Sequence, residues 1–203
     1  MIDIDLKRQF GLKDSIADQF NWIKSNPKDQ CGKTSIHWIA HYMDILCEYS
    51  SKGTKTVELG VNQVNSTFAF LNSTCEEVHS VDVDFHHNPI KDHPTLTRNI
   101  WLDHAIELAN LESKQFFVYE TSSLDIFISD VDLLFVDTLH TYQHCLAELL
   151  RFNYVNNYII LHDTKLFPRL NNAINDFIRI HTNWKIDKIY TSNPGLTILK
   201  KMK

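Results

Sequence analysis

The stretch TVELGVNQVNST, residues 56–67, combines a short β-branched strand, an acidic residue, a glycine and a polar turn that opens a helix. About twenty residues further on, the stretch VHSVDVD, residues 78–84, forms a second strand that ends in carboxylates. A strand, a turn, a helix and a second strand with an acidic tip are typical of nucleotide-cofactor sites, because the acidic side chain accepts hydrogen bonds from ribose hydroxyls. The pattern predicts such a site here.

The composition limits the class of protein. With 203 residues the chain is long enough for one sizeable core, and no Pro-, Gly- or Ser-rich linker divides it. The net charge of −5 does not indicate a basic surface for nucleic acid, so we expect no nucleic-acid partner. The four cysteines lack paired metal spacing, and the sequence shows no signal-peptide pattern or long apolar run. These features predict a cytoplasmic chain with reduced thiols and no membrane partner.

Hydrophobic periodicity and turn signals predict an α/β fold. Two helices, at 12–24 and 36–48, come before the first strand, the second with Thr34 and Ser35 as N-caps. Strands and helices then alternate, which is typical of a mostly parallel sheet with helices on both faces. The last two strands are separated only by TSNPG, so we expect an antiparallel hairpin. The predicted strands are 55–59, 77–81, 115–119, 131–137, 158–161, 184–190 and 196–199, and the predicted helices between them are 66–72, 96–111, 142–152 and 170–180.

A parallel sheet that ends in an antiparallel hairpin separates the class I methyltransferase arrangement from that of dinucleotide dehydrogenases. Together with ELG at 58–60, FVDTLHTY at 135–142 and ILHDT at 160–164, it gives the chain a resemblance to class I S-adenosylmethionine-dependent methyltransferases. Within that class it resembles the metal-dependent O-methyltransferases of the catechol, macrocin and cephalosporin-hydroxylase-like type. The resemblance implies a Rossmann-like, seven-stranded sheet over 54–203, with 1–53 as an N-terminal helical extension on the acceptor side.

The resemblance also implies which residues bind S-adenosylmethionine. Glu58 and Gly60 would line the methionine part, and a side chain at position 60 would obstruct the backbone's approach to a charged ligand. The alternative is an ordinary strand-to-helix turn in which Glu58 caps exposed amides. Relatives usually have a second glycine where this chain has Val64, so the loop must bend differently or leave less room for the cofactor. The full predicted cofactor set is Glu58, Gly60, Asn62, Ser66, Asp82, Ser122 and Asp137.

Two of these assignments have local alternatives. Asp82 resembles the ribose-binding acid, and Asp84 is the second candidate, although a carboxylate at a strand tip can equally cap the next turn. Ser122 lies where relatives present a polar loop to the adenine. A Ser-rich helix start with Ser123 as its N-cap explains the same residues equally well.

Asp137 and Asp163 each follow a buried strand. Neighbouring parallel strands end at the same edge of a sheet, so the two carboxylates should converge where ligands of open α/β folds bind. Oxygen ligands suit Mg²⁺ or Mn²⁺. The resemblance assigns the metal to Asp137, Asp163 and His162, and an imidazole shifts the preference towards Mn²⁺. Alternatively, both acids cap the helices that follow them, and His162 fills part of the cleft wall.

His140 is the predicted general base, acting beside Asp137. An imidazole that titrates near pH 6.5 can accept a hydroxyl proton at neutral pH, and a nearby cation would lower the pKa of that hydroxyl. Tyr142 either lines the pocket or packs in the core as the first residue of its helix. The cluster of His86, His87 and His93 lacks the spacing of a zinc site and is interpreted as a loop over the cofactor.

These residues support three functions. The first is an O-methyltransferase acting on a hydroxyl of a small molecule or carbohydrate. The second is a methyltransferase-like binding module without catalysis, suggested by Val64 and by the sparse metal ligands. The third, a nicotinamide-dependent oxidoreductase, lacks the full Gly-x-Gly-x-x-Gly series and does not explain the terminal hairpin. A homodimer is the default expectation for assembly.

Overall fold

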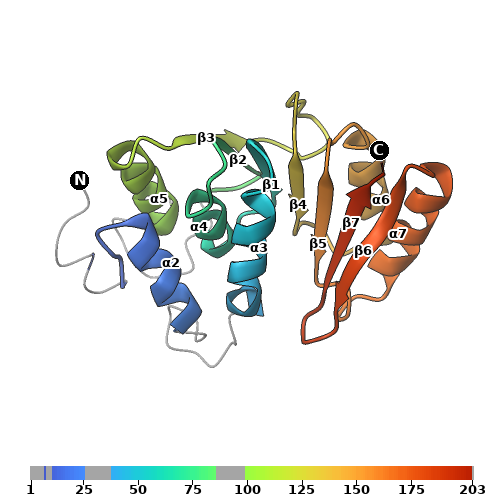
Figure 1. Ribbon diagram of the computed structural model, residues 1–203, viewed down its shortest axis with the longest axis horizontal. Coiled ribbons are helices and arrows are strands. Elements are labelled where there is room, and N and C mark those ends of the chain that lie inside the picture. Colours follow the sequence, from blue (N-terminus) through green and yellow to red (C-terminus); the bar gives the residue numbers. More distant parts are fainter. Residues whose placement is uncertain (1–6, 8–10, 26–37, 86–98, 203) are drawn as a thin grey trace.

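The computed structural model describes residues 7, 11–25, 38–85 and 99–202, which build one seven-stranded sheet with the order β3-β2-β1-β4-β5-β7-β6 (Figure 1). Strands β1 to β5 pair in parallel, whereas β7 is antiparallel to both β5 and β6. This confirms the predicted mostly parallel sheet that ends in an antiparallel hairpin. The strands are β1 Lys55–Leu59, β2 Glu77–Asp82, β3 Gln115–Glu120, β4 Leu133–Val136, β5 Tyr158–His162, β6 Trp184–Tyr190 and β7 Leu196–Lys201.

Helices cover both faces of the sheet, with α2 to α5 on one side and α6 and α7 on the other (Figure 1). Alternate residues of a strand point to opposite faces. Phe135 of β4 therefore packs on Phe70 of α4, with ring centroids 5.5 Å apart, while Leu134 belongs to the core beneath α6 and α7. The helices are α2 Ile16–Ser25, the 3₁₀ helix η1 Trp38–Tyr42, α3 Met43–Ser50, α4 Asn65–Leu71, α5 Ile100–Leu111, α6 Tyr142–Arg151 and α7 Arg169–Ile180.

Local capping explains why two helices start later than predicted. The Ser15 hydroxyl accepts a hydrogen bond from the Asp18 amide at 3.1 Å, so α2 begins after Ser15. The Asn99 side chain accepts from the Trp101 amide, also at 3.1 Å, and α5 begins after it. The predicted helix at 36–48 is divided into η1 and α3, while its predicted caps lie outside the described residues.

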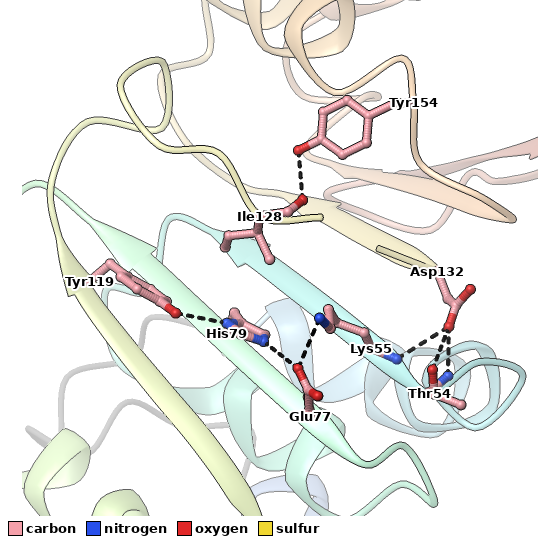
Figure 2. Close-up of polar contacts among 8 residues, drawn as sticks. All are labelled: Thr54, Lys55, Glu77, His79, Tyr119, Ile128, Asp132 and Tyr154. Atoms are coloured by element: carbon pink, nitrogen blue, oxygen red, sulfur yellow. Dashed lines mark hydrogen bonds and ion pairs between the residues drawn. The ribbon is translucent and has the colours of Figure 1, made fainter. Parts of the chain in front are cut away.

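The connection between β3 and β4, residues 121–132, is described throughout and contains no helix, so the predicted helix start with Ser123 as N-cap is wrong. The adjoining sheet face instead carries a row of polar contacts (Figure 2). Lys55 Nζ lies 3.0 Å from Glu77 Oε2, which lies 3.1 Å from His79 Nε2, and His79 Nδ1 lies 3.1 Å from the Tyr119 hydroxyl. The Lys55–Glu77 and His79–Tyr119 contacts join neighbouring strands, and such cross-strand pairs stabilise a sheet.

Among the described residues, the structure contains no helix that is both long and apolar enough to cross a bilayer.

Candidate active site

A cavity of about 280 Å³ opens at the carboxyl edge of the sheet. Its wall is formed by residues 60–62 after β1, 81–83 at the end of β2, 121–123 after β3, 137–139 after β4, and His144 of α6. Ligands of open α/β sheets bind at this edge. The wall contains five of the residues predicted to bind the cofactor: Gly60, Asn62, Asp82, Ser122 and Asp137.

Gly60 is required by the backbone around it. Its φ is +84°, and a Cβ at this position would lie 2.1 Å from the carbonyl oxygen of Asp137. The Asp137 amide also donates to the carbonyl of Leu59 at 2.8 Å, so the ends of β1 and β4 are in direct contact. The sequence analysis attributed the glycine to the approach of a ligand. The structure adds a reason within the protein, because any side chain would separate the two strand ends.

Val64 adopts the left-handed conformation that a glycine would take without strain. Its φ is +64° and its side chain is fully buried in the core beneath α2 to α5. This conformation is an outlier for a β-branched residue. Val64 is absent from the described wall of the cavity, so the side chain leaves that space open. The loop therefore keeps the bend expected of a glycine.

Glu58 is buried behind the loop. Its carboxylate accepts hydrogen bonds from the hydroxyls of Ser66, Thr67 and Ser80, the last two at 2.6 Å each. Burial raises the pKa of Glu58 to about 7, against the opposing effect of these hydroxyls. Neither Glu58 nor Ser66 is part of the described cavity wall. The described partners of Glu58 are hydroxyls of β2 and α4, so the residue joins β1 to both elements. The cofactor roles of Glu58 and Ser66 stay predictions.

Asp82 holds the same loop from the tip of β2. Its Oδ2 accepts from the amides of Val61 at 2.8 Å and Asn62 at 3.3 Å, and its Oδ1 accepts from the Asp84 amide at 3.2 Å. Asp82 lines the cavity, whereas Asp84 is outside the described wall. A carboxylate has about four acceptor positions, so Asp82 retains capacity for a ligand hydroxyl.

The predicted convergence of acids at the ends of β4 and β5 is confirmed. Asp137, His140 and Asp163 each offer one ligand atom, and these atoms lie within 4.8 Å of one another. His140 Nε2 is 2.7 Å from Asp163 Oδ2 and 3.6 Å from Asp137 Oδ1. His162 Nδ1 is 3.2 Å from Asp137 Oδ1. We call these four residues the Asp–His cluster.

Helix capping does not account for the cluster. The N-cap of α6 is Thr141, whose side chain accepts from the His144 amide, and the N-cap of α7 is Pro168. The alternative in which Asp137 and Asp163 cap these helices is therefore wrong. Asp163 also has a φ of +60°, a strained backbone of the kind that concentrates at functional sites.

The close contacts within the cluster lack hydrogen-bond geometry. His162 is only 6% exposed, yet among the described residues neither of its ring nitrogens has a hydrogen-bond partner. The same is true of His140 Nε2 and Asp163 Oδ1. The ligand atoms of Asp137, His140 and Asp163 are close enough to one another to hold one metal ion. Carboxylates together with imidazoles suit Mn²⁺ or a similar divalent ion.

Charge within the cluster moves the pKa values strongly. Burial would raise the pKa of Asp137, but the field of His162 and the contact with His140 outweigh it and lower the pKa to about 2. Asp137 and then Asp163 raise the pKa of His140 to about 9. Without a bound cation, the two carboxylates favour the protonated form of His140 at neutral pH. Its role as general base stays a prediction. Phe167 stacks on the His140 ring at 4.3 Å and fixes its orientation.

Other predicted site residues lie elsewhere. The Tyr142 hydroxyl donates to Asp176 of α7 at 2.7 Å, which places this ring between α6 and α7 and outside the described cavity wall. His86, His87 and His93 lie outside the described residues. Sequence reasoning overlooked His140 as a ligand, although its i, i+3 spacing from Asp137 is visible in the chain. It also overlooked Thr138 and His144 in the cavity wall and Glu148, which contacts both of them. Only the i, i+4 spacing of His144 and Glu148 could have pointed to this pair.

A scan of known protein families and a search of curated protein sequences both found no match to the chain. Solved structures share its fold. Cofactor-bound Rv0187 from MTB has a TM-score of 0.61 at 12% identity, over 98% of this chain and 95% of that one. The ribosomal protein L11 methylase from Lactobacillus delbrueckii subsp. bulgaricus has a TM-score of 0.55 at 13% identity, over 80% of each chain. M. capricolum TrmK in complex with S-adenosyl-homocysteine has a TM-score of 0.55 at 13% identity, over 82% of this chain and 70% of that one. The chain thus has the Rossmann-like fold of class I methyltransferases.

Proposed function

We propose that the protein is an S-adenosylmethionine-dependent methyltransferase that acts on a hydroxyl of a small molecule or carbohydrate with the assistance of a divalent cation, Mg²⁺ or Mn²⁺. One observation carries the proposal: Asp137 belongs both to the wall of the cavity and to the Asp–His cluster. A cofactor in the cavity and an acceptor at the cluster would therefore meet at this side chain. Such proximity supplies much of the catalysis when the donor is already activated, as a sulfonium is.

Each part of the cavity has a role in this proposal. The residual acceptor capacity of Asp82 would hold the ribose hydroxyls, and the open backbone at Gly60 and Asn62 would receive the methionine end. Asp137, His140 and Asp163 would hold the cation, with His162 as a further ligand. A bound cation lowers the pKa of an acceptor hydroxyl. In this proposal His140 serves as a ligand of the cation, and its role as base stays a prediction.

The acceptor would enter beside η1. The Tyr42 ring packs edge-on against the His162 ring with centroids 5.9 Å apart, and its hydroxyl donates to the Ser192 carbonyl at 2.7 Å. The N-terminal helical region and the β6–β7 turn thus meet next to the cluster, which supports the proposed role of residues 1–53 on the acceptor side. The net charge of −5 favours a small molecule or carbohydrate over nucleic acid.

One feature that suggested a module without catalysis, Val64, is weakened because its side chain lies outside the described wall. The ligand atoms of Asp137, His140 and Asp163 lie close enough together to hold one ion, which supports a cation at this site. The antiparallel position of β7 likewise favours a methyltransferase over a nicotinamide-dependent oxidoreductase.

Calorimetry with S-adenosylmethionine and S-adenosylhomocysteine, each with and without Mn²⁺, tests the proposal. We expect both nucleosides to bind, and Mn²⁺ to bind the wild type but not Asp163→Asn. Asp176→Asn, the same chemical change on α7, should keep both affinities. Absence of heat and of any thermal shift at millimolar S-adenosylmethionine would refute the function. Methyl transfer to catechols and sugars then identifies the acceptor class.

A further inference from the structure

A second cavity, of about 760 Å³, opens at the amino edge of the sheet, opposite the edge that carries the Asp–His cluster. Strand β5 begins at this edge and the antiparallel strand β7 ends there, beside the letter C in Figure 1. The described wall contains Lys52, Lys185, Lys200 and Lys201 and no acidic residue. It shares no described residue with the wall of the first cavity. Its charge favours an anion.

Two of these lysines repel each other across the hairpin. Lys185 of β6 and Lys200 of β7 are direct partners in the antiparallel ladder, where like charges destabilise a sheet. Neither ammonium forms an ion pair with a carboxylate of the described residues. Lys200 Nζ lies 5.9 Å from the centroid of the Tyr158 ring. An anion bound between the two ammonium groups would offset their repulsion.

Protection of the sheet edge explains only part of this arrangement. β6 is an edge strand, and lysines on such strands discourage pairing with another chain. This accounts for Lys185 and Lys188, which both belong to β6. It does not account for Lys200 on the inner strand β7, or for Lys52 in the turn after α3. Cations from three separate elements thus converge on one cavity.

Two tyrosine rings hold the lysines near one another. Tyr49 of α3 and Tyr158 of β5 are in edge-to-face contact, with centroids 4.9 Å apart. Lys52 Nζ lies 3.7 Å from the Tyr49 centroid and 5.7 Å from the Tyr158 centroid, and Lys188 Nζ lies 5.8 Å from that of Tyr49. Cation–π contacts orient an ammonium group without neutralising it. The charge of these lysines therefore remains available to a ligand.

The acids close to this group offset only part of its charge. Glu48 pairs with Lys52 at 2.7 Å, and Asp187 of β6 accepts a hydrogen bond from the Tyr49 hydroxyl at 3.0 Å. The ammonium of Lys201 donates to three main-chain carbonyls at 2.9 to 3.3 Å, which commits it to the turn after α6. A net positive charge remains on the side of the cavity next to α3.

We propose that this cavity is a second binding site, for a compact solute that carries several phosphate groups. Ammonium groups bind phosphate oxygens as point charges, and several of them around one space suit several phosphates. The chain has a net charge of −5 in spite of these lysines, so the rest of its surface is more acidic still. A long polyanion would meet that surface, whereas a compact one would stay within the cavity.

Calorimetry with sodium tripolyphosphate tests the proposal on the full chain, without S-adenosylmethionine or divalent cations. We expect one site with micromolar affinity, which weakens about tenfold from about 50 to about 200 mM NaCl because salt screens the lysine charges. Lys200→Gln should reduce the affinity about tenfold, the equivalent of one charge-assisted hydrogen bond. Lys24→Gln removes the same charge from α2, outside the described wall, and should leave the affinity unchanged.

Thermal unfolding separates a binding role of Lys200 from a structural one. Lys200→Gln removes one of two opposed like charges, so the ligand-free variant should be at least as stable as the wild type. Tripolyphosphate should raise the Tm of the wild type more than that of the variant. Absence of binding to the wild type, or equal affinity in Lys200→Gln and Lys24→Gln, overturns the proposal.

A competition experiment tests the size of the ligand. A single-stranded RNA oligonucleotide that displaces tripolyphosphate from the wild type at equal phosphate concentration would overturn the assignment to a compact solute. We expect it to compete poorly. None of these measurements involves the methyl donor or the Asp–His cluster, so their failure would leave the methyltransferase function intact.

Discussion

Glu58 in β1 and Asp137 just beyond β4 are acids on paired strands, yet their pKa values move in opposite directions. Burial among three hydroxyls raises the pKa of Glu58 to about 7, whereas two imidazoles outweigh the burial of Asp137 and lower its pKa to about 2. Hydroxyls satisfy hydrogen bonds without supplying charge, while imidazoles stabilise the ionised form. Glu58 is therefore suited to bracing the fold, and Asp137 retains the charge that a cation or a sulfonium requires.

The largest expected effect comes from removing the charge of Asp163, which belongs to the same cluster as Asp137. Asp163→Asn should reduce methyl transfer by about a thousandfold, in line with the loss of a group that stabilises charge at a reaction centre. It should also abolish Mn²⁺ binding, measured by calorimetry. Unchanged Mn²⁺ affinity in this variant would contradict the assignment of the cluster.

The next test pushes apart the ends of β1 and β4, the strands next to Glu58 and Asp137. Gly60→Ala would place a Cβ 2.1 Å from the Asp137 carbonyl at a φ of +84°. We expect a loss of roughly 4 kcal/mol in the free energy of unfolding, the combined penalty of a left-handed alanine and an overpacked contact. Urea denaturation measures it. A loss below about 1 kcal/mol would show that the β1 and β4 ends can move apart.

The pH dependence of stability tests Glu58. Its folded pKa, about 7, lies above its ordinary value of 4.5, so between these values the folded state holds a proton that the unfolded state has lost. The unfolding free energy should fall as the pH rises through this window, by roughly 3 kcal/mol in total. Glu58→Gln should remove that slope. The measurement is the wild-type minus variant difference in unfolding free energy from pH 4.5 to 8, and a flat difference would refute the raised pKa.

The smallest effect concerns Val64. Val64→Gly should relieve left-handed strain and lose buried apolar contacts, two terms that nearly cancel, so we expect a stability change within about 1 kcal/mol. The affinity for S-adenosylhomocysteine should stay the same because the side chain is outside the described wall. A marked gain in affinity would indicate that Val64 restricts the cavity after all.

The order of elements was predictable because it depends on local signals. Alternating apolar runs located every strand to within about two residues, and the short turn at 191–195 identified the hairpin. The absence of a helix after β3 was not predictable, because Ser122 and Ser123 are typical of a helix start. In the structure Ser123 instead donates to Glu148, 25 residues away in the chain. A tertiary hydrogen bond of this kind leaves no periodic trace in the sequence.

Part of the site was predictable by the same logic. Topology alone places Asp137 and Asp163 at one edge, since parallel neighbours end together. The roles of Glu58 and His140 depend on which groups surround them, and the sequence does not encode those distances. The ribose role of Asp82, the homodimer and the cytoplasmic location stay predictions.

The hairpin has a consequence for the order of assembly. β6 precedes β7 in the chain, yet it reaches β5 only through β7, which lies between them. Strand β6 consequently cannot dock on the sheet before β7 does. The amides of Lys165 and Leu166 donate to the Pro194 carbonyl of the same hairpin at 3.0 Å each. These bonds hold the loop that carries Asp163 and Phe167. Insertion of β7 should thus be the late step that organises the Asp–His cluster at the end of β5, while the side of the cavity at Asp82 can form earlier.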